Sequence, residues 1–172
     1  MKDEKELIAS GKFVRFVRRK GWEYFERINT TGIVVIVAVT DDNKLILTEQ
    51  YRPPVDNLVI ELPAGLAGDI KGEESESLET AAKRELFEET GYEADNMEYL
   101  IDGPPSAGIS KEIVTFFKAS GLKKNGIGGG DDTESIITHA IPVSKIESWL
   151  KEKMEAGFLV DPKVYAGIHF SG

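Results

Sequence analysis

The sequence lacks cysteine altogether, so it can form no disulfide and carries no thiolate. This composition fits a cytoplasmic protein. The chain also lacks an apolar run long enough to cross a bilayer, and its first ten residues have no signal-peptide core. Positive charge is scarce, because 21 Lys and Arg stand against 30 Asp and Glu, for a net charge of −9. Since broad nucleic-acid binding needs a basic surface, we expect no stable nucleic-acid binding.

What is present is typical of a globular domain. The 172 residues are enough for one domain with a hydrophobic core, and hydrophobic residues make up 41% of them. Two stretches near the amino terminus alternate apolar and polar side chains, which predicts a pair of strands joined at Lys20-Gly21. Further strands are predicted over residues 32–40, 44–50, 57–65, 96–103, 112–120 and 134–142. We expect the first two of these to pair as a β-hairpin across the turn at 41–43.

Helices are predicted in three places. The first covers residues 76–90, with Ser75 or Ser77 as N-cap. The second ends at Gly157, and the third opens with Asp161 as N-cap. Because strands outnumber helices and most are joined by loops, the pattern predicts an α+β domain. The glycine-rich segment 123–132 is interpreted as a loop, since no helix start follows it as a phosphate cradle would require.

The first predicted helix places acidic residues on its apolar side. Leu78, Ala82 and Leu86 share one sector at helical spacing, and Glu85 and Glu89 fall within the same sector. Neighbouring like charges on a helix repel, and removing carboxylates from water is costly unless a positive group pairs with them. An ordinary solvated acidic helix is the alternative, and it fits this sector poorly.

A hard divalent cation would resolve the conflict. Mg²⁺ prefers carboxylate oxygens and often bridges to substrate phosphates. Glu85, Glu88 and Glu89 could supply such a site, and the ion would provide the positive charge that the composition lacks. This is our hypothesis for the unusual helix.

The residues around this helix resemble a known motif. Segment 84–92, "RELFEETGY", resembles the core of the Nudix box, G-x5-E-x7-R-E-U-x-E-E-x-G-U, where U is aliphatic or aromatic. Glu76 lies eight positions before Arg84, as the motif requires, and Gly65 resembles its leading glycine. Ten residues separate Gly65 from Glu76 where the motif has five, and Gly72-Glu73 offers a second, poorer register. The helical carboxylates are unaffected by this departure.

The resemblance extends beyond the box. The stretches "EQYRPPV", "ELPAGL", "GPPSAGIS", "DDTESI" and "LVDPKVYAG" are similar to landmarks of the ADP-ribose and ADP-sugar diphosphatases of the Nudix superfamily. The resemblance implies a Nudix fold, with a mixed β-sheet sandwiched between α-helices and an extra N-terminal antiparallel strand pair. It further implies a division into residues 1–30, exchanged between the chains of a homodimer, and a Nudix domain over residues 31–172.

The resemblance also implies roles for single residues in metal binding. Glu85, Glu88 and Glu89 would hold the divalent ions with the backbone carbonyl of Ala64. Arg84 would fix the catalytic helix against the loop by pairing with Glu76 or a neighbouring carboxylate. The alternative for Arg84 is a plain surface partner of Glu88.

Other residues would meet the substrate and the water. Arg52 would reach the diphosphate or the distal sugar, since its fork binds phosphate oxygens in pairs; a rim salt bridge is the alternative. Glu134 matches a catalytic glutamate of the relatives, with Glu112 in reserve, and the alternative for Glu134 is a solvated loop carboxylate. Trp22 would stack on the adenine, with Phe13 of the partner chain on the opposite face, although most strand aromatics are simply core.

The function implied is Mg²⁺- or Mn²⁺-dependent hydrolysis of the diphosphate linkage of ADP-ribose or another nucleoside diphosphate sugar. ADP-ribose would give AMP and ribose 5-phosphate. Two alternatives stay open. One is a Nudix pyrophosphatase acting on nucleoside triphosphates, dinucleoside polyphosphates or capped RNA. The other is a catalytically silent module that binds a nucleotide sugar.

Overall fold

The computed structural model describes residues 4–72, 74–130 and 135–172. These residues form three sheets and three α-helices, so the predicted α+β class is confirmed. The strands are β1 Glu6–Ser10, β2 Val14–Arg19, β3 Trp22–Arg27, β4 Gly32–Ala38, β5 Lys44–Arg52, β6 Asn57–Glu61, β7 Ala64–Ala67, β8 Tyr92–Gly103, β9 Val114–Lys124, β10 Ile137–Pro142 and β11 Leu159–Val160. The helices are α1 Leu78–Thr90, α2 Ile146–Glu155 and α3 Lys163–Ser171.

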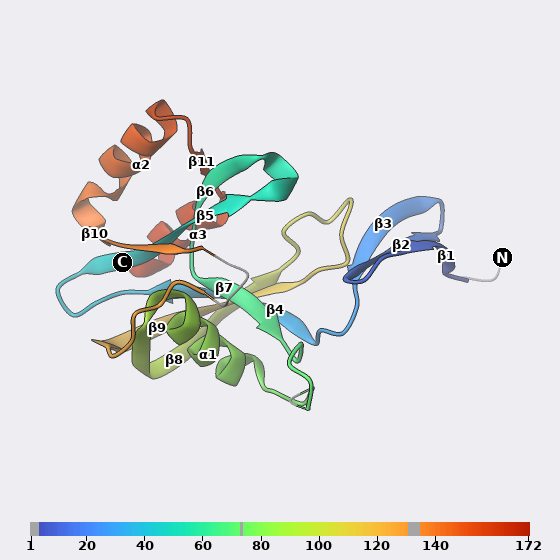
Figure 1. The fold of residues 1–172 in the computed structure, drawn as a ribbon, viewed down its shortest axis with the longest axis horizontal. Coiled ribbons are helices and arrows are strands. Elements are labelled where there is room, and N and C mark those ends of the chain that lie inside the picture. Colours follow the sequence, from blue (N-terminus) through green and yellow to red (C-terminus); the bar gives the residue numbers. More distant parts are fainter. Residues whose placement is uncertain (1–3, 73, 131–134) are drawn as a thin grey trace.

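The amino-terminal strands form a separate antiparallel sheet, β1-β2-β3, which projects from the rest of the chain (Figure 1). The predicted pair is present as β2 and β3. Its turn lies where expected, with both Lys20 and Gly21 at positive φ, as the tight turns of hairpins require. The sequence did not reveal β1, because this strand is short and fully exposed and so shows no buried face.

The other strands form two four-stranded sheets, β7-β4-β9-β8 and β10-β5-β6-β11. Both are mixed, because β4 pairs with β9 in parallel and β6 pairs with β11 in parallel. The predicted hairpin of 32–40 with 44–50 is wrong: the turn forms, but only the bridge Val39–Leu45 joins the two strands. Both strands are continuous buried runs, so each is covered on both faces and they belong to different sheets.

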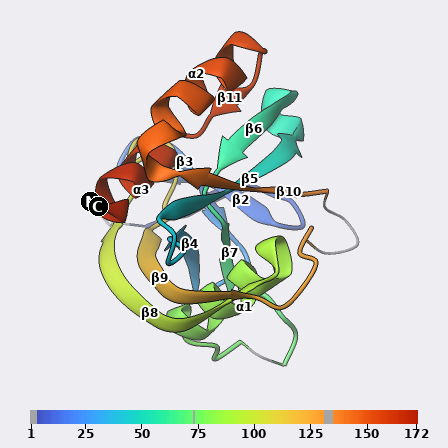
Figure 2. The same cartoon turned by 90° about the vertical axis from the view of Figure 1, so that its left-hand side faces the viewer.

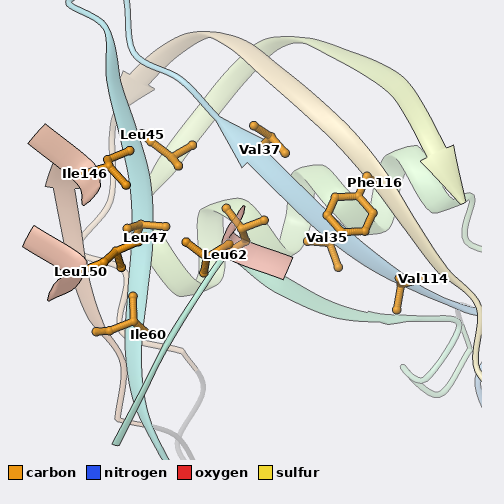
Figure 3. Close-up of a cluster of buried hydrophobic side chains, with 11 residues drawn as sticks. Val35, Val37, Leu45, Leu47, Ile60, Leu62, Val114, Phe116, Ile146 and Leu150 are labelled. Atoms are coloured by element: carbon orange, nitrogen blue, oxygen red, sulfur yellow. The ribbon is translucent and has the colours of Figure 1, made fainter. Parts of the chain in front are cut away.

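Alternate residues of β4 face two hydrophobic clusters. Val34, Ile36 and Ala38 pack against Ala82 and Leu86 of α1. On the other face, the second cluster joins β4 to β5, β6, β9, α2 and α3. Figure 3 shows this cluster, whose members are Val35, Val37, Leu45, Leu47, Ile60, Leu62, Val114, Phe116, Ile146, Leu150 and Val164. The first cluster fixes α1 against the sheet that carries β7.

The helix ends follow local sequence signals. Ser77 caps α1, since its hydroxyl accepts from the Thr80 amide at 3.1 Å, and Gly91 ends it in the left-handed conformation. Figure 2 shows α2 on the outer side of the sheet that contains β5 and β6. Helix α3 begins one residue later than expected, although Asp161 still accepts from the Lys163 amide at 2.7 Å. None of the helices in the described ranges is long and apolar enough to span a membrane.

Candidate functional site

Helix α1 presses two of its carboxylates against the start of β7. The Ala64 amide donates to Glu89 Oε2 at 3.1 Å, and Glu89 is only 5% exposed. Gly65 provides the room for Glu85, because a Cβ at this position would lie 1.9 Å from the Glu85 carboxyl carbon. The inward sector that the sequence predicts for these two residues is therefore present, and Gly65 is the glycine that permits it.

Arg84 ties the helix to the loop that follows β7. Its Nε and Nη2 donate to the two oxygens of Glu76 at 3.0 and 3.1 Å, and Nη2 also donates to the Leu66 carbonyl at 2.8 Å. The remaining nitrogen, Nη1, donates to Glu85 at 2.8 Å and to Glu88 at 2.9 Å. The expected pairing of Arg84 with Glu76 is thus present as a bidentate contact, which holds the guanidinium in one orientation.

These contacts set the charge state of the site. The hydrogen bond from Arg84 lowers the pKa of Glu76, and the surrounding carboxylates raise the pKa of Arg84, led by Glu76. Glu85 behaves in the opposite way. Burial raises its pKa to about 7 and outweighs the attraction of Arg84, while the charges of Glu88 and Asp69 act in the same direction as burial. An additional positive charge beside Glu85 would therefore favour its ionised form.

The long loop between Gly65 and Glu76 does not displace Glu76. The chain turns back so that the Gly68 amide lies 3.5 Å from Glu76 Oε2, next to the last residue of β7. The extra residues are therefore accommodated in the segment between Gly68 and Glu76. Glu73, which belongs to the alternative register, lies outside the described residues.

Comparison with known proteins identifies this arrangement. A sequence profile of the NUDIX domain matches residues 30–157. The chain belongs to the Nudix family. It is 37% identical over 129 residues to the methanol dehydrogenase activator of Bacillus methanolicus. This alignment covers 74% of this chain and 67% of that protein. It is also 37% identical over 124 residues to the ADP-ribose pyrophosphatase of Bacillus subtilis, covering 69% of this chain and 64% of that protein.

Structural comparison supports the fold of this Nudix chain. A solved structure titled "Crystal structure of ADP compounds hydrolase" superposes with a TM-score of 0.64 at 23% identity, over 86% of this chain and 80% of that one. The Nudix fold expected from the sequence is therefore confirmed. One detail differs from the expectation, since three strands rather than two form the amino-terminal sheet.

Nudix hydrolases need a divalent metal ion, and the residues of the box fit one by their chemistry. Glu85, Glu88 and Glu89 offer hard oxygen donors within two turns of one helix, and Gly65 leaves the space in which Glu85 lies. In the parts of the chain that the structure describes, no three acidic or histidine side chains already converge as a cation site. The Glu88 carboxylate instead binds Arg84, and it is 46% exposed, so it has room to turn inward.

Arg52 lies at the end of β5, beside Glu61 at the end of β6. Its Nε donates to Glu61 Oε2 at 2.7 Å, while 39% of the Arg52 side chain remains exposed. The strand register places Thr48 opposite Glu61 and Arg52 opposite Asn57, so these four side chains share one face of the sheet. Ile46, on the same face of β5, packs in the cluster that contains α1, so the face is the one directed toward the Nudix helix.

The two predicted aromatic residues lie at opposite ends of the amino-terminal sheet. Trp22 starts β3 opposite Arg19, whereas Phe13 precedes β2 and its carbonyl accepts from the Ile28 amide at 2.9 Å. Trp22 is 66% exposed and Phe13 65% exposed, so neither is a core aromatic. One chain does not bring the two rings together, and their pairing across a base stays a prediction that requires a second chain.

The two candidates for the general base are Glu134 and Glu112. Glu134 lies outside the described residues. Glu112 accepts from Arg27 Nε at 2.5 Å and lines a cavity of about 410 Å³ between the amino-terminal sheet and the Nudix domain. Glu112 is therefore held by an ion pair, and its reserve role stays a prediction.

Sequence reasoning missed Glu61 and the Leu66 carbonyl. Glu61 is 14% exposed at its side chain and orients Arg52, and Leu66 accepts from Arg84. Glu61 carried a usable signal, because a carboxylate that ends the apolar run "LVI" needs a cation nearby. The Leu66 carbonyl carried none, because backbone groups look alike in a sequence.

Proposed function

We propose that the protein hydrolyses the diphosphate linkage of ADP-ribose and related nucleoside diphosphate sugars, with Mg²⁺ or Mn²⁺ as cofactor. The observation that carries the proposal is the placement of Glu85 and Glu89 against Ala64 and Gly65, with Glu88 next to Glu89 in the same turn. This set of donors suits a divalent ion that also binds a diphosphate. The substrate class is supported by the Bacillus subtilis relative, which is an ADP-ribose pyrophosphatase.

In this proposal Glu85, Glu88, Glu89 and the Ala64 carbonyl hold the ions. When bound, a divalent ion neutralises charge on the diphosphate and lowers the pKa of water. The chain does the positioning. Arg84 anchors the box through Glu76, so that the carboxylates keep their places as substrate enters.

Arg52 is proposed to bind the diphosphate or the distal sugar. Glu61 occupies its Nε, and the terminal nitrogens still carry N–H groups that can donate to phosphate oxygens. Glu134, or Glu112 in its place, would accept the proton of the attacking water. Hydrolysis then separates AMP from ribose 5-phosphate, or a nucleotide from a sugar 1-phosphate for other substrates.

We further propose that the protein works as a homodimer. The amino-terminal sheet exposes large apolar side chains, among them Leu7 at 58%, Phe13 at 65% and Trp22 at 66%. A second chain would cover such residues and would bring a Phe13 to the Trp22 of its partner. Light scattering after gel filtration tests this proposal, and a monomer at micromolar concentration that is fully active would contradict it. A cytoplasmic location and the absence of stable nucleic-acid binding belong to the same proposal.

A phosphoanhydride panel with and without Mg²⁺ tests the function. It contains ADP-ribose, ADP-glucose, GDP-mannose, ATP, a diadenosine polyphosphate and capped RNA, with products separated by ion-exchange chromatography. We expect AMP and ribose 5-phosphate from ADP-ribose at the highest kcat/KM. A higher kcat/KM for ATP or capped RNA would mean that the proposed substrate class is wrong. Tight ADP-ribose binding without hydrolysis would show a binding module.

Variants of the box connect this activity to the site. Glu88→Gln and Glu89→Gln keep the shape of the side chain, and in Glu89→Gln the side-chain amide oxygen can still accept from the Ala64 amide. We expect each to lower kcat by at least about a hundred-fold, since each removes one anionic ligand. Glu79→Gln, on the exposed face of the same helix, is the matched control. Near-normal turnover in both box variants would refute the metal assignment.

A further inference from the structure

Hydrogen-bond donors surround the end of α1 that carries Glu88 and Glu89. The last four carbonyls of a helix have no partner within the helix. Here each of them has an external donor. The Phe87 carbonyl still accepts from the Gly91 amide, the C-cap of the helix itself, so the last four carbonyls are those of Glu88, Glu89, Thr90 and Gly91. The Gly130 amide donates to the Glu88 carbonyl at 3.1 Å and the Gly129 amide to the Glu89 carbonyl at 2.8 Å. The Lys124 ammonium donates to the Thr90 carbonyl.

Further contacts reinforce the same end. The Thr138 hydroxyl donates to the Glu89 carbonyl at 3.3 Å, and the Asn125 and Gly126 amides both donate to the Gly91 carbonyl at 3.0 Å. The ring of Tyr92 lies 4.9 Å from the Lys124 ammonium. We call Lys124–Gly130 together with Thr138 the α1 collar. It comes from the end of β9, the loop after it and β10, all distant from α1 in sequence.

The glycines of the α1 collar allow its backbone to touch the helix. A Cβ at Gly128 would lie 2.6 Å from the Thr90 carbonyl carbon and 2.8 Å from the Glu89 oxygen. Gly128 also has a φ of +72°, which disfavours other residues. Close contact with the last turn of α1 thus explains the glycine at position 128.

The α1 collar also brings a positive charge to the last turn of α1, where acidic side chains lie. The carboxyl end of a helix carries about half a negative charge, which disfavours acidic side chains there and favours cations. Glu88 and Glu89 lie in that turn, and the last turn of α1 contains no basic residue of its own. Lys124 supplies the missing positive charge from outside the helix.

We propose that the α1 collar holds the last turn of α1 in the geometry in which Glu88 and Glu89 bind the divalent ion, with Lys124 as a positioning residue. The inference rests on the proposed function, since it assumes that these carboxylates are ligands. It goes further by assigning a role to residues that touch neither the ion nor the substrate.

Mn²⁺ affinity of the protein without substrate tests the inference, measured by electron paramagnetic resonance of free Mn²⁺. Lys124→Met keeps the stem and removes the charge. We expect it to raise the Kd for Mn²⁺ by about two- to five-fold, the size of one lost hydrogen bond, because the last turn of α1 loses the donor to the Thr90 carbonyl. Lys124→Arg should restore the wild-type Kd. The matched control is Lys123→Met, since the neighbouring Lys123 is 62% exposed and pairs with Asp95 on the surface.

The thermal midpoint of each metal-free variant separates positioning from plain stability. A lower midpoint in Lys124→Met with an unchanged Kd would overturn the inference, because the α1 collar would then be a structural brace only. If Lys124→Met does not fold, Thr138→Val decides, since it removes a single donor to the Glu89 carbonyl. An unchanged Kd in that variant would overturn the inference equally.

Failure of this inference and failure of the proposed function look different. If only the inference fails, wild-type protein still hydrolyses ADP-ribose and binds Mn²⁺, and the collar variants bind it equally well. If the proposed function fails, wild-type protein shows no Mg²⁺-dependent release of AMP. Wild-type protein that binds no Mn²⁺ would overturn both.

Discussion

Replacing Glu85 by glutamine should make the metal-free protein more stable while it abolishes hydrolysis. Glu85 is packed against Gly65, and burial raises its pKa from 4.5 to about 7. The ionised carboxylate is thus disfavoured in the folded chain. Glutamine has nearly the same shape, and its amide oxygen can still accept from Arg84, but it carries no charge to desolvate.

The magnitude follows from the pKa. Each pKa unit corresponds to about 1.4 kcal/mol, so the difference between the folded and unfolded chains amounts to about 3 kcal/mol. Because the folded pKa is the higher one, folding takes up a proton between pH 4.5 and about 7. The stabilisation linked to Glu85 is complete below pH 4.5 and is lost as the pH rises through about 7. The wild-type protein therefore carries the full penalty at pH 8.5.

Urea unfolding followed by tryptophan fluorescence, in the presence of a chelator and from pH 5 to pH 8.5, measures this effect. We expect Glu85→Gln to raise the free energy of unfolding by about 1–3 kcal/mol at pH 8.5 and to flatten its dependence on pH between 5 and 8. Glu79→Gln, on the exposed face of α1, should stay within about 0.5 kcal/mol of wild type. A Glu85→Gln protein that is less stable at pH 8.5, or that keeps the wild-type pH dependence, would refute this reasoning.

Three further predictions concern other residues of the site. Gly65→Ala should lower kcat at least about a hundred-fold, because the new Cβ would lie 1.9 Å from the Glu85 carboxyl carbon, and steady-state assays of the folded variant check it. Arg84→Gln should cost about 3 kcal/mol of unfolding free energy, since Glu76 is left buried without its cation, and urea unfolding at pH 7 checks it. Glu61→Gln should raise KM for ADP-ribose about ten-fold with little change in kcat, because Arg52 loses its orienting partner; an equal fall in kcat would contradict that role.

Local signals allowed much of the fold to be predicted. Gly91 ends α1 in the structure as predicted, and Ser77 is the one of the two predicted N-caps that caps the helix. The residue types at Lys20-Gly21 predict the turn that the structure shows there. The hairpin of 32–40 with 44–50 was wrong for a physical reason. Runs that are buried on both faces lack alternation, so the sequence contains no information on which edge each strand pairs with.

In the candidate site, too, some residues could be predicted from local pattern and others could not. Acidic residues in an apolar sector of one helix are a local pattern, so the inward placement of Glu85 and Glu89 could be predicted from spacing. The donors that meet the helix end could not. Lys124 and Thr138 lie 34 and 49 residues from the carbonyls that they contact. The pairing of Lys124 with Tyr92 across β8 and β9, and the path of β10, bring them there. Long-range packing of this kind leaves no periodic trace.

The hydrogen bonds of Arg84 to both Glu85 and Glu88 affect how the protein behaves when a chelator removes its cation. Arg84 already supplies a counter-charge to the acidic face, and it is anchored by Glu76 and the Leu66 carbonyl whether or not Glu88 stays with it. The fold therefore does not need the ion in order to form, in contrast to small domains that unfold when their metal is removed, although a bound ion would still add to stability. Dialysis against a chelator should leave a silent but intact protein, which regains its turnover as soon as the ion is returned.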